Sequence, residues 1–200
     1  DKELIAEAFV TFSRELSVIA ARSVSGEIKV YPLAENDHSA GILRVSRVPA
    51  QNTSPEKEAQ AKGFITTLLE KLDHVGVLTL ELFDTDTGLV ANEMAPRVHN
   101  SGHWSIEGAH CSQFENHIRA ICDMPLGDTQ SRQPFAGMIN IIGKHGDRNL
   151  VLSKANCFYH AYGKDERVNR KIGHINLIAD SEQELENSIS SLHAFITECG

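Results

Sequence analysis

The alternation of apolar and polar positions in the first fifty residues predicts short strands. The expected strands lie at residues 4–10, 15–23, 27–33 and 42–48, each rich in Val, Ile, Leu or Phe. Residues 11–14 separate the first two strands and predict a strand pair, and residues 35–41 are expected to be a polar loop. This part of the chain is therefore predicted to consist mainly of strands.

Three capped helices are predicted from side-chain signals at their first turns. Ser54 and Pro55 supply an N-cap and a proline at the first helical position, for a helix that ends near His74. The apolar stripe of that helix is expected at Ala61, Ile65, Leu68 and Leu72. Capping boxes at 112–115 and 181–184 begin two more helices. Their apolar faces are expected to be Phe114, Ile118, Ile121 and Cys122 in one, and Leu185, Ile189, Leu192 and Ile196 in the other.

The remaining pattern predicts a hairpin in the middle of the chain and a second group of strands near its end. Segments 77–83 and 89–95 flank a glycine-containing loop. Three further strands are expected at 138–143, 156–162 and 171–179. Because residues 127–134 are polar and end in proline, we predict one domain over 1–127 and another over 128–200. The fold class is α+β.

A pair of acidic residues in the predicted hairpin is the first candidate site. If the loop closes symmetrically, partner numbers sum to 174 and Glu81 lies opposite Glu93. Like charges at directly opposed positions are destabilising, unless protonation, solvent or a cation relieves them. Carboxylate pairs of this kind hold Mg²⁺ together with substrate phosphates. The alternative interpretation is a solvated hairpin face.

Two clusters of polar and basic residues are further candidates. The loop that follows the hairpin carries Arg97, His99, Asn100 and Ser101 beside a glycine, which is typical of an anion cradle. The alternative is an ordered loop that satisfies its own polar groups. A basic cluster, Lys164, Arg167, Arg170 and Lys171, lies between two predicted strands and is alternatively a solvated hairpin tip.

The composition of the chain argues against two classes of binding partner. With 27 acidic and 19 basic residues the formal charge is −8, which argues against duplex nucleic acid and anionic membranes as partners. No apolar run approaches the roughly 18 residues that cross a bilayer. The four cysteines, Cys111, Cys122, Cys157 and Cys199, form no Cys-x-x-Cys pair, so we expect free thiols in a reducing cytoplasm.

Residues 92–104, NEMAPRVHNSGHW, together with 112–117, SQFENH, closely resemble the 5-(carboxyamino)imidazole ribonucleotide synthases. These are ATP-dependent carboxylases of purine biosynthesis in the ATP-grasp superfamily, and the resemblance is collinear over essentially the whole chain. It implies the C-terminal part of an ATP-grasp domain, an antiparallel sheet with helices, followed by a small β-rich domain. Such synthases are nearly twice as long, and the sequence opens with Asp1 rather than Met and reaches a strand-like segment at Leu4 with no preceding turn or cap. We therefore expect a fragment that is inactive by itself.

The resemblance also implies roles for individual residues. Glu81 and Glu93 would ligate Mg²⁺, and the residues implied at ATP are Glu7, Ala8, Phe9, Val10, Glu15, His38, Asn92 and Glu93. Many relatives carry a glutamate where this chain has Ala8, but nearby adenine contacts come largely from the backbone. Arg97 and His99 would be catalytic. The implied contacts to bicarbonate and substrate are Arg97, His99, Asn100, Ser101, Lys164 and Arg170.

The reaction that the resemblance implies is the carboxylation of the exocyclic amine of 5-aminoimidazole ribonucleotide. ATP and bicarbonate form carboxyphosphate, and ADP and phosphate are the other products. The implied cofactors are ATP and Mg²⁺, and we expect a homodimer in the cytoplasm. Two alternatives stay open. One is another ATP-grasp ligase, such as a biotin carboxylase or a formate-dependent glycinamide ribonucleotide transformylase. The other is a non-catalytic module that binds a metal or a partner.

Overall fold

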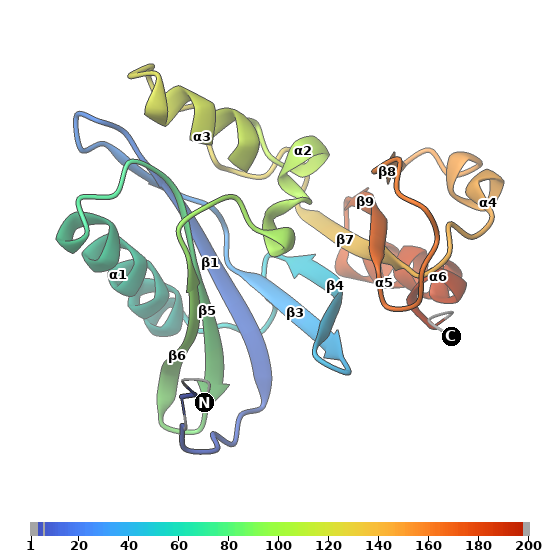
Figure 1. The fold of residues 1–200 in the computed structure, drawn as a ribbon, viewed down its shortest axis with the longest axis horizontal. Helices are drawn as coiled ribbons and strands as arrows, with labels where there is room; N and C mark the ends of the chain where they lie inside the picture. The colour runs from blue at the N-terminus through green and yellow to red at the C-terminus, as the bar shows by residue number, and fades with distance from the viewer. Residues whose placement is uncertain (1–3, 6, 198–200) are drawn as a thin grey trace.

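A computed structural model describes residues 4, 5 and 7–197, and within them nine strands form one antiparallel sheet (Figure 1). The strand order is β6-β5-β1-β3-β4-β7-β9-β8, with β2 paired to β1 alone. The strands are β1 Arg14–Arg22, β2 Ile28–Val30, β3 Ala34–Ser39, β4 Ile42–Val48, β5 Gly76–Thr85, β6 Gly88–Ala95, β7 Phe135–Ile142, β8 Cys157–Ala161 and β9 Lys171–Ala179. The helices are α1 Pro55–Lys71, α2 Ser105–Gly108, α3 Gln113–Ile121, α4 Arg148–Leu152, α5 Glu182–Ser191 and α6 His193–Thr197, with a 3₁₀ turn η1 at Asn100–Gly102. The predicted α+β class is confirmed.

Helices cover both faces of the first part of the sheet. Helix α1 begins where Ser54 accepts a hydrogen bond from the Lys57 amide, and it buries Ala61, Ile65 and Leu69. The apolar cluster beneath α1 contains every second residue of β1 and β5, among them Leu16 and Leu78. Strand side chains alternate between the two faces of a sheet, which explains this spacing. The intervening residues of β1 face a second cluster, which contains Trp104 and Ala120 from the α2 and α3 side. The polar side chains of the candidate site share this second face.

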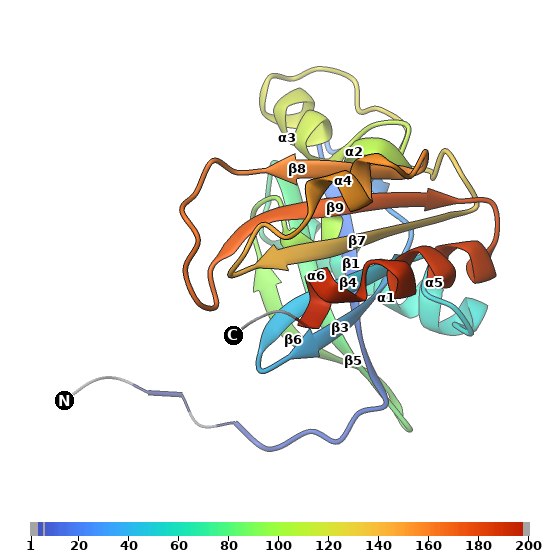
Figure 2. The ribbon, with the colours of Figure 1, turned by 90° about the vertical axis from the view of Figure 1, so that its right-hand side faces the viewer.

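The second part of the sheet has its own apolar cluster. Residues of β7 and β9, such as Ile141 and Ile175, pack against Leu185, Ile189 and Leu192 at the end of the chain (Figure 2). Ser181 caps α5 by accepting a hydrogen bond from the Glu184 amide, as the capping box predicts. The three predicted C-terminal strands and this apolar face are confirmed. The side chain of Ile196 and all of Cys199 lie outside the described residues.

Two predictions for the first fifty residues are wrong. The described part of 4–10 forms no strand, and Leu4, Ile5 and Phe9 are at least 90% exposed. The expected polar loop at 35–41 is largely strand β3. Polar residues occupy this strand because it lies in the middle of the sheet at the candidate site, where buried Asn36 bonds Ser17 and Ser46.

Helix α3 presents its apolar face to solvent, contrary to the prediction. Ile118 and Ile121 are 54% and 50% exposed, and Phe114 and Cys122 are also exposed. The helix instead docks through Gln113, Asn116 and Ala120. The docked amides have specific partners: Asn116 bonds the Tyr31 hydroxyl and Gly127, and Gln113 bonds the backbone of His99. Hydrogen bonding of buried amides therefore decides the orientation of this helix.

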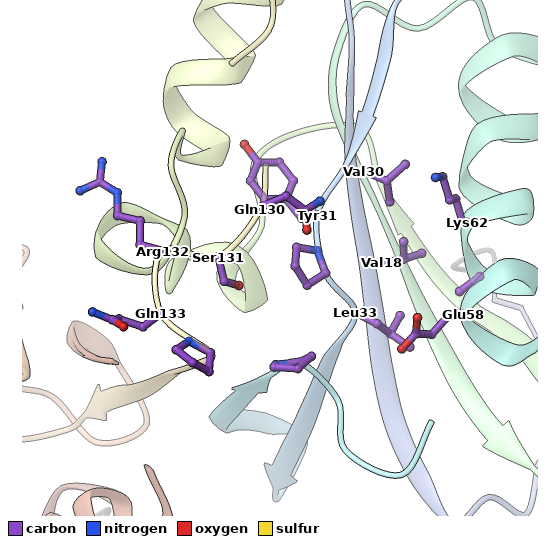
Figure 3. A pocket seen from close by; sticks show the side chains of 14 residues that line it. Val18, Val30, Tyr31, Leu33, Glu58, Lys62, Gln130, Ser131, Arg132 and Gln133 are labelled. Carbon is purple, nitrogen blue, oxygen red and sulfur yellow. The ribbon is translucent and has the colours of Figure 1, made fainter. Parts of the chain in front are cut away.

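The sheet continues across the predicted domain boundary, because β4 pairs with β7 over four residue pairs. The division at 127/128 stays a prediction. Residues 130–134 line a hollow of about 640 Å³ with α1 and β1 (Figure 3). Its β1 residue is Val18, which lies on the α1 side of the sheet, so the hollow is separate from the polar face. In the described part of the chain no helix has the length and apolarity to cross a bilayer, and Cys111, Cys122 and Cys157 are free thiols.

Candidate functional site

The carboxylates Glu81 and Glu93 lie at a bulge in the β5–β6 hairpin. Thr79 pairs with Ala95 and Leu80 with Met94, as the predicted register requires, but Leu82 pairs with Ala91, one residue out of that register. Two residues of β6, Asn92 and Glu93, thus face the single residue Glu81 of β5. The bulge lies in the outermost strand, in which Val90 and Met94 are 38% and 41% exposed.

Negative charge accumulates around Glu81. Burial raises the pKa of its carboxyl group, the charges of Glu93 and Glu15 raise it further, and Arg97 lowers it. Glu15 comes from β1, and its Oε2 lies 2.6 Å from Nδ1 of His38 on β3. Four residues that the sequence assigns to ATP or metal are thus brought together from four strands.

This donor set fits Mg²⁺ bound together with a ligand. Among the described residues no group of three or more His, Cys, Asp or Glu side chains is arranged to hold a metal ion. Mg²⁺ sites, however, commonly use one or two carboxylates, with phosphate oxygens and water completing the octahedron. The raised pKa of Glu81 shows a carboxylate that a nearby cation would stabilise.

The loop after β6 is held rigidly against the carboxylates. Gln113 accepts a hydrogen bond from the His99 amide at 2.9 Å and donates one to the His99 carbonyl at 2.6 Å. Ser105 donates to the Gly102 carbonyl at 2.6 Å. His99 Nε2 consequently lies 3.5 Å from Glu81 Oε1. The predicted anion loop and the predicted metal pair are neighbours.

The imidazole of His99 is half-buried between the Glu81 carboxylate and several basic side chains. Burial, with smaller contributions from Arg97, Lys171 and His38, lowers the pKa of His99 to about 4. The ring is therefore neutral at pH 7. Arg97 itself is exposed and donates a hydrogen bond to the Val98 carbonyl at 2.9 Å.

Lys171 belongs to the predicted basic cluster but was not assigned to the substrate. The predicted Arg170 is exposed and donates to the Asp165 carbonyl at 3.4 Å, while Lys164 lies over the ring of Tyr162, 5.4 Å from its centroid. Lys171 is half-buried, and burial together with the charges of Lys164 and Arg97 lowers its pKa to about 8. Its only sequence signal was membership of the basic cluster.

A cluster of aromatic side chains connects this loop to β8 and β9. The Tyr162 hydroxyl lies 3.2 Å from Nδ1 of His103 and 2.7 Å from Nδ1 of His174. His160 stacks on His174 at 4.4 Å, and its Nε2 lies 3.0 Å from Glu107 on α2. His174 is buried among these side chains. The cluster links the loop to the strand that begins at Lys171.

Several residues that the resemblance assigns to ATP lie apart from the carboxylates and the anion loop. Glu7, Ala8 and Phe9 are exposed and Val10 is half-buried, in an extended segment ahead of β1 that runs outside the sheet (Figure 2). Asn92 is also exposed. Their assignment to ATP stays a prediction.

The depressed pKa of Lys171 predicts a pH-dependent stability. Because the pKa falls from 10.5 to about 8 on folding, the charged ammonium destabilises the fold below pH 8, and this cost disappears as pH rises from 8 to 10.5. We expect Lys171→Met to be more stable than the parent chain at pH 7, with the difference shrinking by pH 10. Urea unfolding at both pH values measures this, with the exposed Lys144→Met as control. A difference that does not change with pH would contradict the prediction.

Comparison with known proteins identifies the class. Residues 1–114 match the ATP-grasp domain family, and residues 136–188 match the phosphoribosylaminoimidazole carboxylase C-terminal domain family. The chain belongs to the ATP-grasp family.

Its relatives are more specific. The N5-carboxyaminoimidazole ribonucleotide synthase of Vibrio vulnificus strain YJ016 is 47% identical over 195 residues, which are 98% of this chain and 51% of that protein. The Escherichia coli K12 protein of the same name is 41% identical over 95% of this chain and 53% of its own length. The predicted resemblance to these synthases is confirmed, and the chain spans about half the length of the curated relatives it matches.

Solved structures agree with this assignment. The crystal structure of N5-carboxyaminoimidazole ribonucleotide synthetase from Thermus thermophilus superposes with a TM-score of 0.93 at 46% identity, covering 96% of this chain and 53% of that one. The Aspergillus clavatus synthase in complex with ADP and 5-aminoimidazole ribonucleotide gives 0.87 at 32% identity, covering 94% and 52%.

Proposed function

We propose that the protein acts as an N5-carboxyaminoimidazole ribonucleotide synthase, using ATP, Mg²⁺ and bicarbonate to carboxylate 5-aminoimidazole ribonucleotide. The observation that carries this proposal is the 3.5 Å approach of His99 Nε2 to Glu81 Oε1. It joins a carboxylate pair suited to a nucleotide-bound cation with a loop suited to a small anion. The named relatives, and the structure that holds ADP and 5-aminoimidazole ribonucleotide, support the same reaction.

The proposed chemistry has two steps. A bicarbonate oxygen attacks the γ-phosphorus of ATP, giving carboxyphosphate and ADP. The exocyclic amine of the ribonucleotide then attacks the carboxyl carbon, phosphate leaves, and the amine loses a proton. Bound Mg²⁺ would supply charge neutralisation at the transferred phosphoryl group, with Glu81 and Glu93 as its protein ligands. Glu7, Ala8, Phe9, Val10, Glu15, His38 and Asn92 are proposed to contact ATP.

The remaining residues of the site would hold the anions. Arg97 and His99, with Asn100 and Ser101, are proposed to bind bicarbonate and to stabilise the negative charge that develops on its oxygens. Lys164 and Arg170 are proposed at the ribonucleotide phosphate. The half-buried position of Lys171 near Arg97 supports adding it to this group. These cations would offset the net charge of −8 where anionic substrates bind.

The test is His99→Ala in the protein of full family length. Because His99 lies in the anion loop, we expect carboxylation to fall by about 10²-fold, the magnitude typical of removing one oriented donor, while the affinity for ATP stays within about twofold. ADP release with bicarbonate and ribonucleotide measures the carboxylation rate, and calorimetry with Mg·ATP measures the affinity for ATP. The exposed His110→Ala is the matched control. An unchanged rate at saturating bicarbonate would remove His99 from the site.

Two other interpretations remain as outcomes of the same assay. Another ATP-grasp ligase would release ADP with a different amine acceptor, and a non-catalytic module would release none with any acceptor. We also propose a homodimer in the cytoplasm. The exposed apolar residues of α3, Ile118 and Ile121, support a protein contact on that helix.

A further inference from the structure

A chain of buried hydrogen bonds runs from the middle of the sheet to His99. Ser46 on β4 donates to Asn36 Oδ1 at 2.7 Å, and Asn36 Nδ2 donates to Ser17 Oγ at 3.0 Å. Ser17 donates to Ser101 Oγ at 2.8 Å, and that oxygen lies 2.9 Å from Nδ1 of His99. The first four members are at most 4% exposed. Burial shields these bonds from solvent, so their direction is set by the protein.

The donor-to-acceptor direction of these hydrogen bonds is fixed at both ends of the series. The Asn36 amide nitrogen is only a donor, so Ser17 accepts from it and uses its own proton for Ser101. Ser101 in turn has its proton free for the imidazole. At the other end, the backbone amide of Ser101 also points at Nδ1 of His99, at 3.3 Å. A backbone amide can only donate, so this ring nitrogen must accept and carries no proton.

We infer that Ser46, Asn36 and Ser17 are positioning residues that act through Ser101 to hold His99 as the neutral Nε2–H tautomer, which makes the ring a hydrogen-bond donor to an oxyanion. An imidazolium would place a second proton on Nδ1, directly against two donors. The protonated Nε2 is the atom that faces the Glu81 side of the site.

The inference rests on the proposed function for its consequence. A donor at Nε2 would bind an oxygen of bicarbonate or carboxyphosphate and would not take a proton from the ribonucleotide amine. The chain of hydrogen bonds therefore assigns His99 to orienting and stabilising the anion. The tautomer itself does not depend on which reaction the protein catalyses.

The tautomer is read directly by nitrogen NMR of the 200-residue chain labelled with ¹⁵N-histidine, at neutral pH and without substrates. The His99 signals are assigned by their loss in His99→Gln. We expect one nitrogen with the shift of an unprotonated ring nitrogen, assigned to Nδ1, and a protonated Nε2. An Nδ1–H ring, or shifts averaged between the tautomers, would overturn the inference without bearing on the proposed reaction.

The chain of hydrogen bonds is tested by Ser101→Ala and Ser17→Ala. Both should move the His99 shifts toward an average of the two tautomers, Ser101→Ala by more because it removes the hydroxyl that touches the ring. Thr79→Val is the matched control, since Thr79 is equally buried in β5 and its hydroxyl has no partner among the described residues. Unchanged shifts in both serine variants, or an equal change in Thr79→Val, would show that these bonds do not set the tautomer. The parent spectrum decides the tautomer even where a serine variant fails to fold.

Discussion

Replacing Glu93 by glutamine in the protein of full family length is expected to lower turnover by roughly 10²- to 10³-fold. Glutamine has nearly the same shape but no charge, so it cannot neutralise a cation at the phosphates, a contribution of several kcal/mol to the transition state. The fold should persist, because Glu93 is exposed at a bulge and its removal relieves repulsion on Glu81. The measurement is Mg²⁺-dependent ADP release at saturating substrates.

Asp86→Asn is the control for this prediction. Asp86 is an exposed acid in the tip of the same hairpin, outside the cluster formed by Glu15, Glu81 and Glu93. Its replacement should leave turnover unchanged. A Glu93→Gln enzyme with near-normal activity would show that the acidic pair is a solvated hairpin face.

Gly102→Ala is expected to destabilise the chain by about 2–3 kcal/mol, the upper part of the range for overpacking a filled site. A methyl group there would meet Gln113 Oε1 at 2.5 Å and Ile19 Cδ1 at 2.6 Å. Gln113 has little freedom to move away, because both ends of its amide bond the His99 backbone. The same substitution should therefore loosen the anion loop as well as lower stability.

Urea unfolding measures this loss, and Gly63→Ala is the control. Gly63 lies in α1, and no atom beyond its chain neighbours and the backbone of the helix itself is within 4 Å of the position a methyl group would take. Because alanine is the better helix former, the control should stabilise the chain by about 0.5–1 kcal/mol. Equal effects at the two glycines would mean that the Gln113 contact does not constrain the loop.

Elements with local signals were predictable from the sequence. Three helix starts were predicted from their N-cap serines, Ser54, Ser112 and Ser181. Each serine accepts the expected hydrogen bond from a backbone amide of the first turn. The errors came where distant partners decide the outcome. Apolar residues 4–10 have no strand partner in their described part, and polar Asn36 is buried because serines from β1 and β4 satisfy its amide.

In the candidate site, too, local signals were predictable and contacts between distant residues were not. The register rule brought Glu81 close to Glu93 but did not predict the bulge, because nothing local in β6 marks the inserted residue. The sequence named Lys171 only as part of the basic cluster, because its half-buried position and the nearby charge of Arg97 are set by the fold. The bond from Ser17 to Ser101 joins residues 84 positions apart, which no local pattern indicates.

The pairing of β4 with β7 has a mechanical consequence. Four residue pairs, from Val45–Ile139 to Val48–Ala136, join the range that matches the ATP-grasp family to the range that matches the carboxylase C-terminal family. Arg47 adds an ion pair to Glu186 on α5. A hinge between the two ranges would break this ladder, so we expect Lys171 and the carboxylate pair to keep a constant separation. In the proposed function, substrates would therefore bind between charged groups held at a fixed spacing.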